Sequence, residues 1–218
     1  MRSAVAILSG GLDSTVSTAA AIRAGWRVRE AVYFDYGQKA ARRERRASKA
    51  VAKYFGIDWS EIDLPWLGAV TRTALVGKAA PPRPSEADLD SPRSRATAKA
   101  VWVPNRNGVF LNIAAALAES RGAAWIVTGF DREEAETFPD NSEEFIAATD
   151  RALFYSTANH VRVRSFVSRL DKAGIVRLGH RLGAPLDRIW SCYLGGSRPC
   201  GSCESCRRSI RAFRSAGA

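Results

Sequence analysis

Apolar positions along the chain fall into short runs that alternate with stretches of helical spacing. The first run, residues 5–8, predicts a strand, and apolar positions at 16, 19, 20 and 24 predict the helix that follows it. Four more runs predict strands, at residues 27–34, 59–64, 125–128 and 161–166. Helical spacing returns between and after them, in residues 40–55, 103–117, 142–153 and 171–176. Strands that alternate with helices in this way predict an α/β fold with a doubly wound parallel sheet.

Residues 65–104 interrupt this alternation. They contain six prolines and no sustained apolar periodicity. A segment of this length without regular structure is uncommon inside a compact domain and is often functional. We therefore expect a long loop or lid that closes over a bound substrate. This segment belongs to a predicted main domain that covers residues 1–185.

The turn after the first predicted strand has the sequence Ser9-Gly10-Gly11-Leu12-Asp13-Ser14. Its two glycines allow backbone N–H groups to curl around an oxyanion, and the helix that follows adds the positive end of its dipole. Asp13 could hold Mg²⁺ against bound phosphates. A purely structural Gly-Gly turn is the alternative. All six residues of this turn suit phosphate binding, however, and the turn lies between a predicted strand and a predicted helix, so phosphate binding is favoured. The P-loop motif Gly-x-x-x-x-Gly-Lys-Ser/Thr is absent from the sequence.

The charge balance raises the question of an anionic partner. The 218 residues include 33 basic and 22 acidic side chains, which gives a formal charge of +11. Basic residues gather in 39–53, whereas residues 131–150 hold eight acidic side chains. A solvated helix face explains the basic cluster, and attraction to tRNA or phosphate is the alternative. No apolar run approaches the length of a membrane span, so we expect a cytoplasmic protein.

All four cysteines lie within a short stretch near the end of the sequence, at Cys192, Cys200, Cys203 and Cys206. Such clustering in a cytosolic protein favours a metal site over disulfides. Two Cys-x-x-Cys steps that share Cys203 suit tetrahedral Zn²⁺, with Cys192 as the fourth ligand. A [4Fe–4S] cluster is the main alternative, and a redox dithiol fits less well. We expect residues 186–218 to form a small zinc-binding segment whose metal is structural.

Two basic residues lie at the starts of predicted helices. Lys172 lies in the first turn of the helix predicted from residue 171, where a cation opposes the helix dipole. Either a bound phosphate or an ordinary surface position explains this lysine. Arg106 opens the helix that follows residue 103, at the mouth of the predicted site.

Four motifs together resemble the 7-cyano-7-deazaguanine synthases, a family of N-type ATP pyrophosphatases with the adenine nucleotide alpha hydrolase-like (PP-loop) fold. The motifs are Ser-Gly-Gly-Leu-Asp-Ser at 9–14, Phe-Asp-Tyr-Gly-Gln at 34–38, Val-Pro-x-Arg-Asn at 103–107, and Trp-Ser-Cys-Tyr with the three later cysteines. The resemblance implies an ATP-dependent ligase that converts 7-carboxy-7-deazaguanine and ammonia to 7-cyano-7-deazaguanine through adenylated intermediates, in queuosine biosynthesis. It also implies Zn²⁺ on the four cysteines.

The motifs and the resemblance together lead to a set of expected site residues. Asp13 and Lys172 are the expected catalytic residues. The expected ATP contacts are Leu8, Ser9, Gly10, Gly11, Leu12, Asp13, Ser14, Thr15, Val16, Ser17, Thr18 and Arg106. For the purine, Asp131 or Asp140 could accept hydrogen bonds from guanine N–H groups, while Phe130 or Phe138 stacks on the base.

The loop at 135–142 departs from the family pattern and keeps only Pro139 and Asp140, and Ala40 stands where the family commonly has histidine. Two other functional classes stay open. One is an enzyme of the same loop family that modifies a tRNA base directly. The other is a non-enzymatic zinc module, against which the phosphate loop argues. We expect a small-molecule acceptor with ammonia, no direct contact with nucleic acid or membrane, and a homodimer.

Overall fold

A five-stranded parallel sheet forms the centre of the computed structural model, which describes residues 1–91 and 98–217. The strands are β1 (Ser3–Ile7), β2 (Arg27–Asp35), β3 (Asp58–Asp63), β4 (Trp125–Thr128) and β5 (Arg162–Ser165). Their order in the sheet is β3-β2-β1-β4-β5, and every pair of neighbours is parallel. The predicted doubly wound parallel α/β sheet is therefore confirmed, with each strand close to its expected position.

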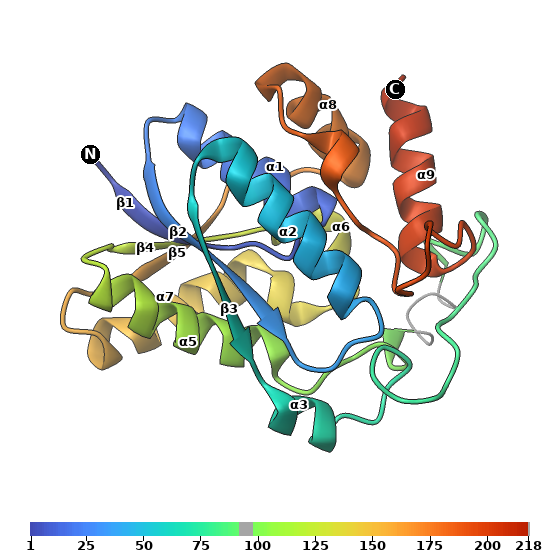
Figure 1. Cartoon of the computed structure of the whole chain (residues 1–218), viewed down its shortest axis with the longest axis horizontal. Coiled ribbons are helices and arrows are strands. Elements are labelled where there is room, and N and C mark those ends of the chain that lie inside the picture. The colour runs from blue at the N-terminus through green and yellow to red at the C-terminus, as the bar shows by residue number, and fades with distance from the viewer. Residues whose placement is uncertain (92–97, 218) are drawn as a thin grey trace.

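Helices cover both faces of the sheet (Figure 1). They are α1 (Leu12–Arg23) and α2 (Ala41–Phe55) on one face, and α5 (Arg106–Ser120) and α7 (Glu143–Ser156) on the other. The alternation of side chains along each strand divides the core between these layers. Val5 and Ile126 pack with side chains of α5, whereas their neighbours Ala6 and Val127 pack beneath α1.

The order of the strands reverses between β1 and β4. The chain runs outward from β1 through β2 to β3, and then crosses to the other side of β1 to form β4 and β5. Ligands of open α/β sheets bind at the carboxyl ends of the strands, at such a reversal. Here the loops after β1 and β4 meet. A Cβ on Gly129 would lie only 2.4 Å from the Ser14 nitrogen, so the absent side chain permits this contact.

The sequence pattern does not predict several shorter elements or the last helix. These are α3 (Pro65–Val70), α6 (Arg132–Ala135), α9 (Glu204–Ala216) and the 3₁₀ turns η1 (Pro139–Asn141) and η2 (Leu186–Arg188). By contrast, α8 (Lys172–Leu182) starts where expected. The segment 65–104, expected to be a long loop, begins with α3 and continues as turns and irregular backbone through 71–91, while residues 92–97 lie outside the described part.

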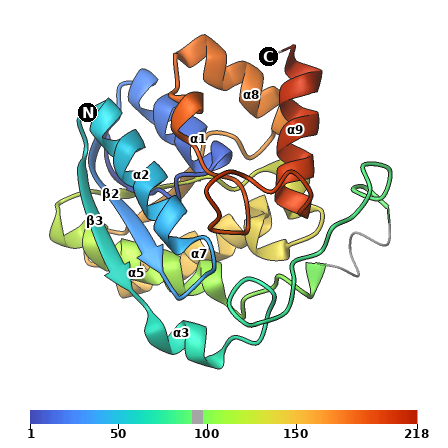
Figure 2. The same cartoon turned by 45° about the vertical axis from the view of Figure 1, so that its right-hand side comes forward.

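The last helix, α9, packs against α8. Ala212 and Phe213 of α9 share an apolar cluster with Ile175 and Val176 of α8. Within the 65–104 segment, α3 lies away from α9, whereas residues 82–90 lie beside the start of α9 (Figures 1 and 2), where the Glu204 N–H donates to the Pro82 carbonyl at 3.2 Å. Among the helices that can be described, none combines the length and the apolar character that a membrane crossing requires.

Candidate active site

The loop between β1 and α1 has the shape of an anion site. Gly10 has a φ of +80°, and a Cβ there would lie 2.5 Å from the Ser48 nitrogen in α2, so only glycine fits. Ser9 Oγ and Ser14 Oγ lie 3.0 Å apart, and both residues line a cavity. Among the described residues no side chain caps the start of α1. Its first N–H groups are therefore available to an anion.

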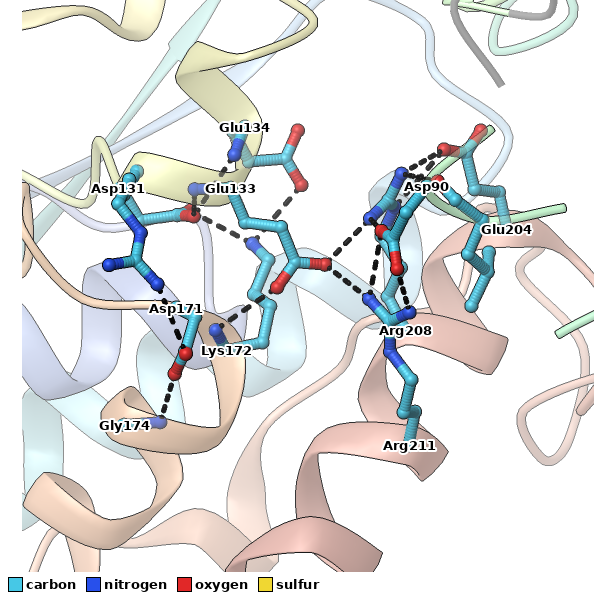
Figure 3. Close-up of polar contacts among 12 residues, drawn as sticks. Asp90, Asp131, Glu133, Glu134, Asp171, Lys172, Gly174, Glu204, Arg208 and Arg211 are labelled. Atoms are coloured by element: carbon cyan, nitrogen blue, oxygen red, sulfur yellow. Dashed lines mark hydrogen bonds and ion pairs between the residues drawn. The ribbon is translucent and has the colours of Figure 1, made fainter. Parts of the chain in front are cut away.

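Lys172 joins three carboxylates beside this loop, and Figure 3 shows two of them, Asp131 and Glu134. Its Nζ donates to Asp13 Oδ2 at 2.8 Å and to Asp131 Oδ2 at 2.9 Å, and lies 3.1 Å from Glu134 Oε1. Asp171 caps α8, which makes Lys172 the first residue of that helix. The Lys172 side chain is only 10% exposed and that of Asp131 is fully buried. Lys172 is therefore held in place and is not an ordinary surface lysine.

Burial and charge shift the acid–base behaviour of this cluster. Burial raises the pKa of Asp13, and raises the pKa of Asp131 to about 7, while Lys172 opposes both shifts. Burial alone would lower the pKa of Lys172, but the surrounding carboxylates raise it well above its usual value. Asp13 Oδ1 is buried and has no hydrogen-bond partner within the described ranges. A buried carboxylate oxygen without a donor suits a metal ligand.

A cavity of about 290 Å³ opens from this cluster. Aromatic side chains form part of its walls. Phe34 and Phe110 stack with ring centroids 4.2 Å apart, and Trp102 lies nearly parallel to Phe138 at 6.0 Å. The volume is close to the lower limit of about 300 Å³ that is typical of small-molecule sites.

A second polar group lines the same cavity. Glu44 Oε2 accepts a hydrogen bond from Gln38 Nε2 at 2.8 Å, and Gln38 Nε2 also donates to Tyr33 Oη at 2.8 Å. Arg106 Nη1 lies 3.5 Å from Tyr36 Oη. Burial raises the pKa of Glu44, and Gln38 and Arg106 oppose that shift. The cavity thus holds a carboxylate and a guanidinium in addition to the Lys172 cluster.

The four cysteines come together as predicted. The Sγ atoms of Cys192, Cys200, Cys203 and Cys206 all lie within 4.8 Å of one another. The N–H groups of Leu194 and Cys200 donate to Cys192 Sγ at 3.3 and 3.4 Å. A hydrogen bond with Cys206 lowers the pKa of Cys203 to about 5. Because the thiolate is the metal-binding form, these contacts are typical of a metal site.

The cysteine segment and α9 also form part of the cavity wall. Trp190, Tyr193, Ser205 and Arg208 all line it. The Trp190 N–H donates to the Gly10 carbonyl at 2.8 Å, which ties the segment to the loop after β1. The C-terminal part of the chain therefore completes the site.

Glu133 connects α9 with the Lys172 cluster (Figure 3). Its Oε1 accepts hydrogen bonds from Arg208 at 2.6 Å and from Arg211 at 2.9 Å, and its Oε2 accepts one from the Lys172 backbone N–H at 3.2 Å. Asp90, in the 65–104 segment, pairs with Arg208 at 3.5 Å and with Arg211 at 2.5 Å. A connected polar network of this kind fixes the positions of its members. The 65–104 segment is thereby fastened to α9.

The expected ATP contacts fall into two groups. Ser9, Gly11, Leu12, Asp13 and Ser14 line the cavity, and Gly10 forms the turn behind them. Leu8, Thr15, Val16, Ser17 and Thr18 are buried and lie outside the cavity lining. The side chains of this second group are packed in the protein interior, and contacts between these residues and ATP stay a prediction.

The residues expected to contact the purine differ in whether their polar atoms already have partners within the protein. Phe130, Asp131, Phe138 and Asp140 all line the cavity. Asp131 has both carboxylate oxygens engaged, because Oδ1 accepts the N–H groups of residues 133 and 134 and Oδ2 accepts Lys172. Asp131 thus caps α6 and pairs with Lys172, and a contact between it and the purine stays a prediction. Arg106, expected to contact ATP, lies beside Tyr36.

Sequence reasoning missed Glu44, Glu134 and Arg208 as cavity residues. For Glu44 a signal was present, because it is the one acidic residue in the basic stretch 39–53. Glu134 gives no comparable signal, since it is one of eight acidic residues between 131 and 150. Arg208 could be placed only once α9 was known to pack against the site.

Comparison with known proteins identifies the family of this chain. The family model described as "Queuosine biosynthesis protein QueC" matches residues 3–217. The chain belongs to the QueC family. QueC relatives named 7-cyano-7-deazaguanine synthase match over almost their whole length. That of Carboxydothermus hydrogenoformans is 53% identical, with 97% of this chain and 98% of the relative covered, and that of Pelotomaculum thermopropionicum is 52% identical, with 100% and 98% covered.

Among solved structures, a U34-tRNA thiolase, NcsA from Methanococcus maripaludis with its [4Fe-4S] cluster, is similar with a TM-score of 0.49. The sequence identity is 13%, and the match covers 98% of this chain and 64% of that chain. Neither its substrate nor its cluster is carried over to this protein. The QueC assignment and the observed sheet confirm the expected PP-loop fold.

Proposed function

We propose that this protein is an ATP-dependent synthase that converts 7-carboxy-7-deazaguanine and ammonia to 7-cyano-7-deazaguanine in queuosine biosynthesis. The observation that supports this most directly is the cavity, in which the loop after β1 and the buried Lys172 cluster share one chamber with aromatic walls. The names of the full-length relatives support the same conclusion.

The proposed reaction uses ATP twice. In the first half, a carboxylate oxygen of the acceptor attacks the α-phosphorus, pyrophosphate leaves, and ammonia then displaces AMP with loss of a proton to give the primary amide. In the second half, the amide oxygen attacks the α-phosphorus of a second ATP, and pyrophosphate and one proton leave. Loss of AMP and the remaining N–H proton gives the nitrile. Because both halves need the same phosphate contacts, one cavity suits both.

The residues beside the loop fit ATP and Mg²⁺. Ser9, Ser14 and the first N–H groups of α1 would hold the pyrophosphate end of ATP. Asp13 would hold Mg²⁺, because its Oδ1 lacks a donor among the described residues and the cluster contains three carboxylates for one ammonium. Bound there, Mg²⁺ would offset the charge of the phosphate oxygens. The Lys172 ammonium stabilises the charge that develops at the α-phosphoryl group.

The spacing of the cysteine sulfurs favours a single Zn²⁺ ion. With Zn–S distances near 2.3 Å, the sulfurs of a tetrahedral site lie roughly 3.8 Å apart. The Cys200 and Cys206 sulfurs are 3.9 Å apart, and all four lie within 4.8 Å of one another. A [4Fe–4S] cluster attaches each thiolate to a different iron and needs a wider arrangement. With four thiolates bound no position stays open, so we assign the ion a structural role.

The remaining cavity residues suit a flat, polar base. We propose that Phe130 and Phe138 stack on the acceptor and that Asp140 accepts an N–H group from it. The 65–104 segment, fastened through Asp90 to α9, would keep water from an acyl-adenylate. We also propose that the protein forms a homodimer.

Direct modification of tRNA has less support. Glu134 and Asp140 add negative charge to the cavity lining, which would repel a phosphate backbone. Part of the basic surface of α2 is also used within the protein. Arg45 pairs with Asp35 at 2.6 Å, and Arg43 Nε donates to the Gly196 carbonyl at 2.7 Å.

The test of the proposal is incubation of the purified metal-loaded protein with ATP, MgCl₂, an ammonium salt and 7-carboxy-7-deazaguanine. We expect the nitrile by mass spectrometry, with two AMP and two pyrophosphate formed per nitrile. ADP as the sole nucleotide product, or turnover of tRNA but not of the free base, contradicts the proposal.

The Asp13→Asn variant is expected to turn over roughly 10- to 100-fold more slowly and to need more Mg²⁺ for half-maximal rate. The substitution keeps the shape of the side chain and removes the charge proposed to hold the ion. Pyrophosphate release measured over a range of MgCl₂ concentrations checks this. Asp187→Asn is the control, because the Asp187 side chain is 81% exposed. An unchanged Mg²⁺ requirement in Asp13→Asn removes Asp13 from the metal site.

A further inference from the structure

Glu44 stands out because it is the one acidic residue of a basic stretch and faces the cavity. The first turns of α2 pack against the loop after β1, where a Cβ on Gly10 would meet the Glu44 carbonyl at 2.9 Å and the Ser48 nitrogen at 2.5 Å. The position of Glu44 next to the loop is therefore set by the backbone, and no role has been assigned to its carboxylate so far.

Gln38 fixes the orientation of this carboxylate. Its Nε2 donates to Glu44 Oε2 at 2.8 Å, to Tyr33 Oη at 2.8 Å and to the Phe34 carbonyl at 3.2 Å. Its Oε1 accepts the Tyr36 N–H at 2.9 Å. The buried amide is thus held from both ends, so Glu44 is held as an acceptor with a defined direction.

A positive group lies close to Glu44 in the same cavity. Arg106 follows Asn105, whose left-handed backbone (φ 52°) starts α5 beside the cavity. Arg106 and Glu44 both line the cavity, Arg106 Nη1 lies 3.5 Å from Tyr36 Oη, and the Tyr36 N–H donates to the same Gln38 amide that holds Glu44. The cavity therefore offers a hydrogen-bond acceptor and a hydrogen-bond donor near one another, between aromatic walls.

We propose that Glu44 accepts hydrogen bonds from the N1–H and the 2-amino group of a guanine-type base, and that Arg106 donates to its O6 carbonyl. This inference rests on the proposed function and names the groups that select its acceptor. The Watson–Crick edge of guanine carries two neighbouring donors and one acceptor, which a carboxylate and a guanidinium complement. Adenine carries one donor and one acceptor there, and a carboxylate would face its N1 lone pair.

The energetics of burial explain why such a site discriminates. A carboxylate that loses water on ligand binding needs hydrogen bonds in exchange. Gln38 supplies one to Glu44, and the guanine edge supplies the others. An analogue that lacks the 2-amino group leaves the buried acceptor short of a donor, and sites of this kind reject such analogues strongly. Glu44 is thus a specificity residue, whereas Lys172 and Asp13 serve the phosphates.

The experiment compares two acceptors, 7-carboxy-7-deazaguanine and its analogue without the 2-amino group. The wild-type protein is expected to prefer the first by at least about tenfold in kcat/KM. In Glu44→Gln, the side-chain amide would present an N–H group toward the N–H groups of the base. We expect kcat/KM for the guanine acceptor to fall roughly 10- to 100-fold and the preference to collapse, with the KM for ATP unchanged within about twofold. Glu144→Gln, on the exposed surface of α7, is the matched control.

Two results would overturn the assignment. One is a preference between the acceptors that survives in Glu44→Gln. The other is a KM for ATP that rises in Glu44→Gln by the same factor with both acceptors, which would indicate that Glu44 contacts the adenine of ATP. If Glu44→Gln does not melt cooperatively, calorimetric binding of the two acceptors to the wild-type protein decides, and equal affinities overturn the proposal. Absence of wild-type turnover with ATP and the guanine acceptor counts against the proposed function and leaves the binding comparison as the test of Glu44.

Discussion

In the Lys172→Met variant, kcat is expected to fall roughly 100- to 1,000-fold, because the variant lacks the ammonium that we propose faces the transferring phosphoryl group. The same substitution leaves three carboxylates without their shared partner. Breaking a buried ion pair costs about 3–5 kcal/mol, which for a chain of this size lowers Tm by roughly 10 °C. AMP release and differential scanning calorimetry measure the two effects.

The Lys172 experiment has a second readout that an ordinary packing role would not give. Without the lysine, Asp13, Asp131 and Glu134 repel one another, so added Mg²⁺ should raise the Tm of the variant more than that of the wild type. Lys53→Met is the control, because Lys53 is exposed on α2. A normal kcat in Lys172→Met, or a Tm that Mg²⁺ raises no more than in the wild type, contradicts the proposed role of Lys172.

We expect the Cys203→Ser variant to lose the zinc ion that we propose, the fold of residues 190–206 and its activity together. Structural zinc contributes on the order of 10 kcal/mol to the folding of small zinc-finger peptides, so three remaining thiolates should not preserve this segment. Activity should fail as well, because Trp190 and Tyr193 of the same segment line the cavity. Metal analysis and amide hydrogen exchange across residues 190–206 measure the first two losses.

Ser197→Ala, at an exposed position of the same segment, is the control for Cys203→Ser and should keep one zinc per chain. A metal-free protein with normal melting contradicts the structural role. A wild-type protein that is brown and absorbs visible light identifies iron and sulfide in place of zinc.

The sheet could be read from the sequence because each strand has its own apolar run and each crossover has helical spacing. The helix α9 could not, since its start contains Glu204 and Arg208, buried charges that a pattern of apolar positions treats as surface. Arg208 pairs with Glu204 at 3.1 Å and with Glu133, and these ion pairs compensate the cost of burying the charges. Because Glu133 lies about seventy positions earlier in the sequence, no local pattern could predict this contact.

The site residues that could be predicted lie in contiguous motifs or carry a charge that is unusual for their position. The loop after β1 and the four cysteines are contiguous motifs, and the position of Lys172 against the helix dipole marked it as unusual. Asp131 illustrates the limit, because an acidic residue after a strand predicts an exposed ligand-binding group as readily as a buried cap. Only the tertiary contact with Lys172 decides between them.

The contact between Trp190 and Gly10 joins the last quarter of the chain to its first turn. Because translation runs from the N-terminus, the loop after β1 is made long before the segment that walls its cavity. The cavity wall is therefore completed only after residues 190–208 have been made and have folded against the sheet. A chain in which these residues stay unfolded should keep its sheet but have a cavity that is open on one side.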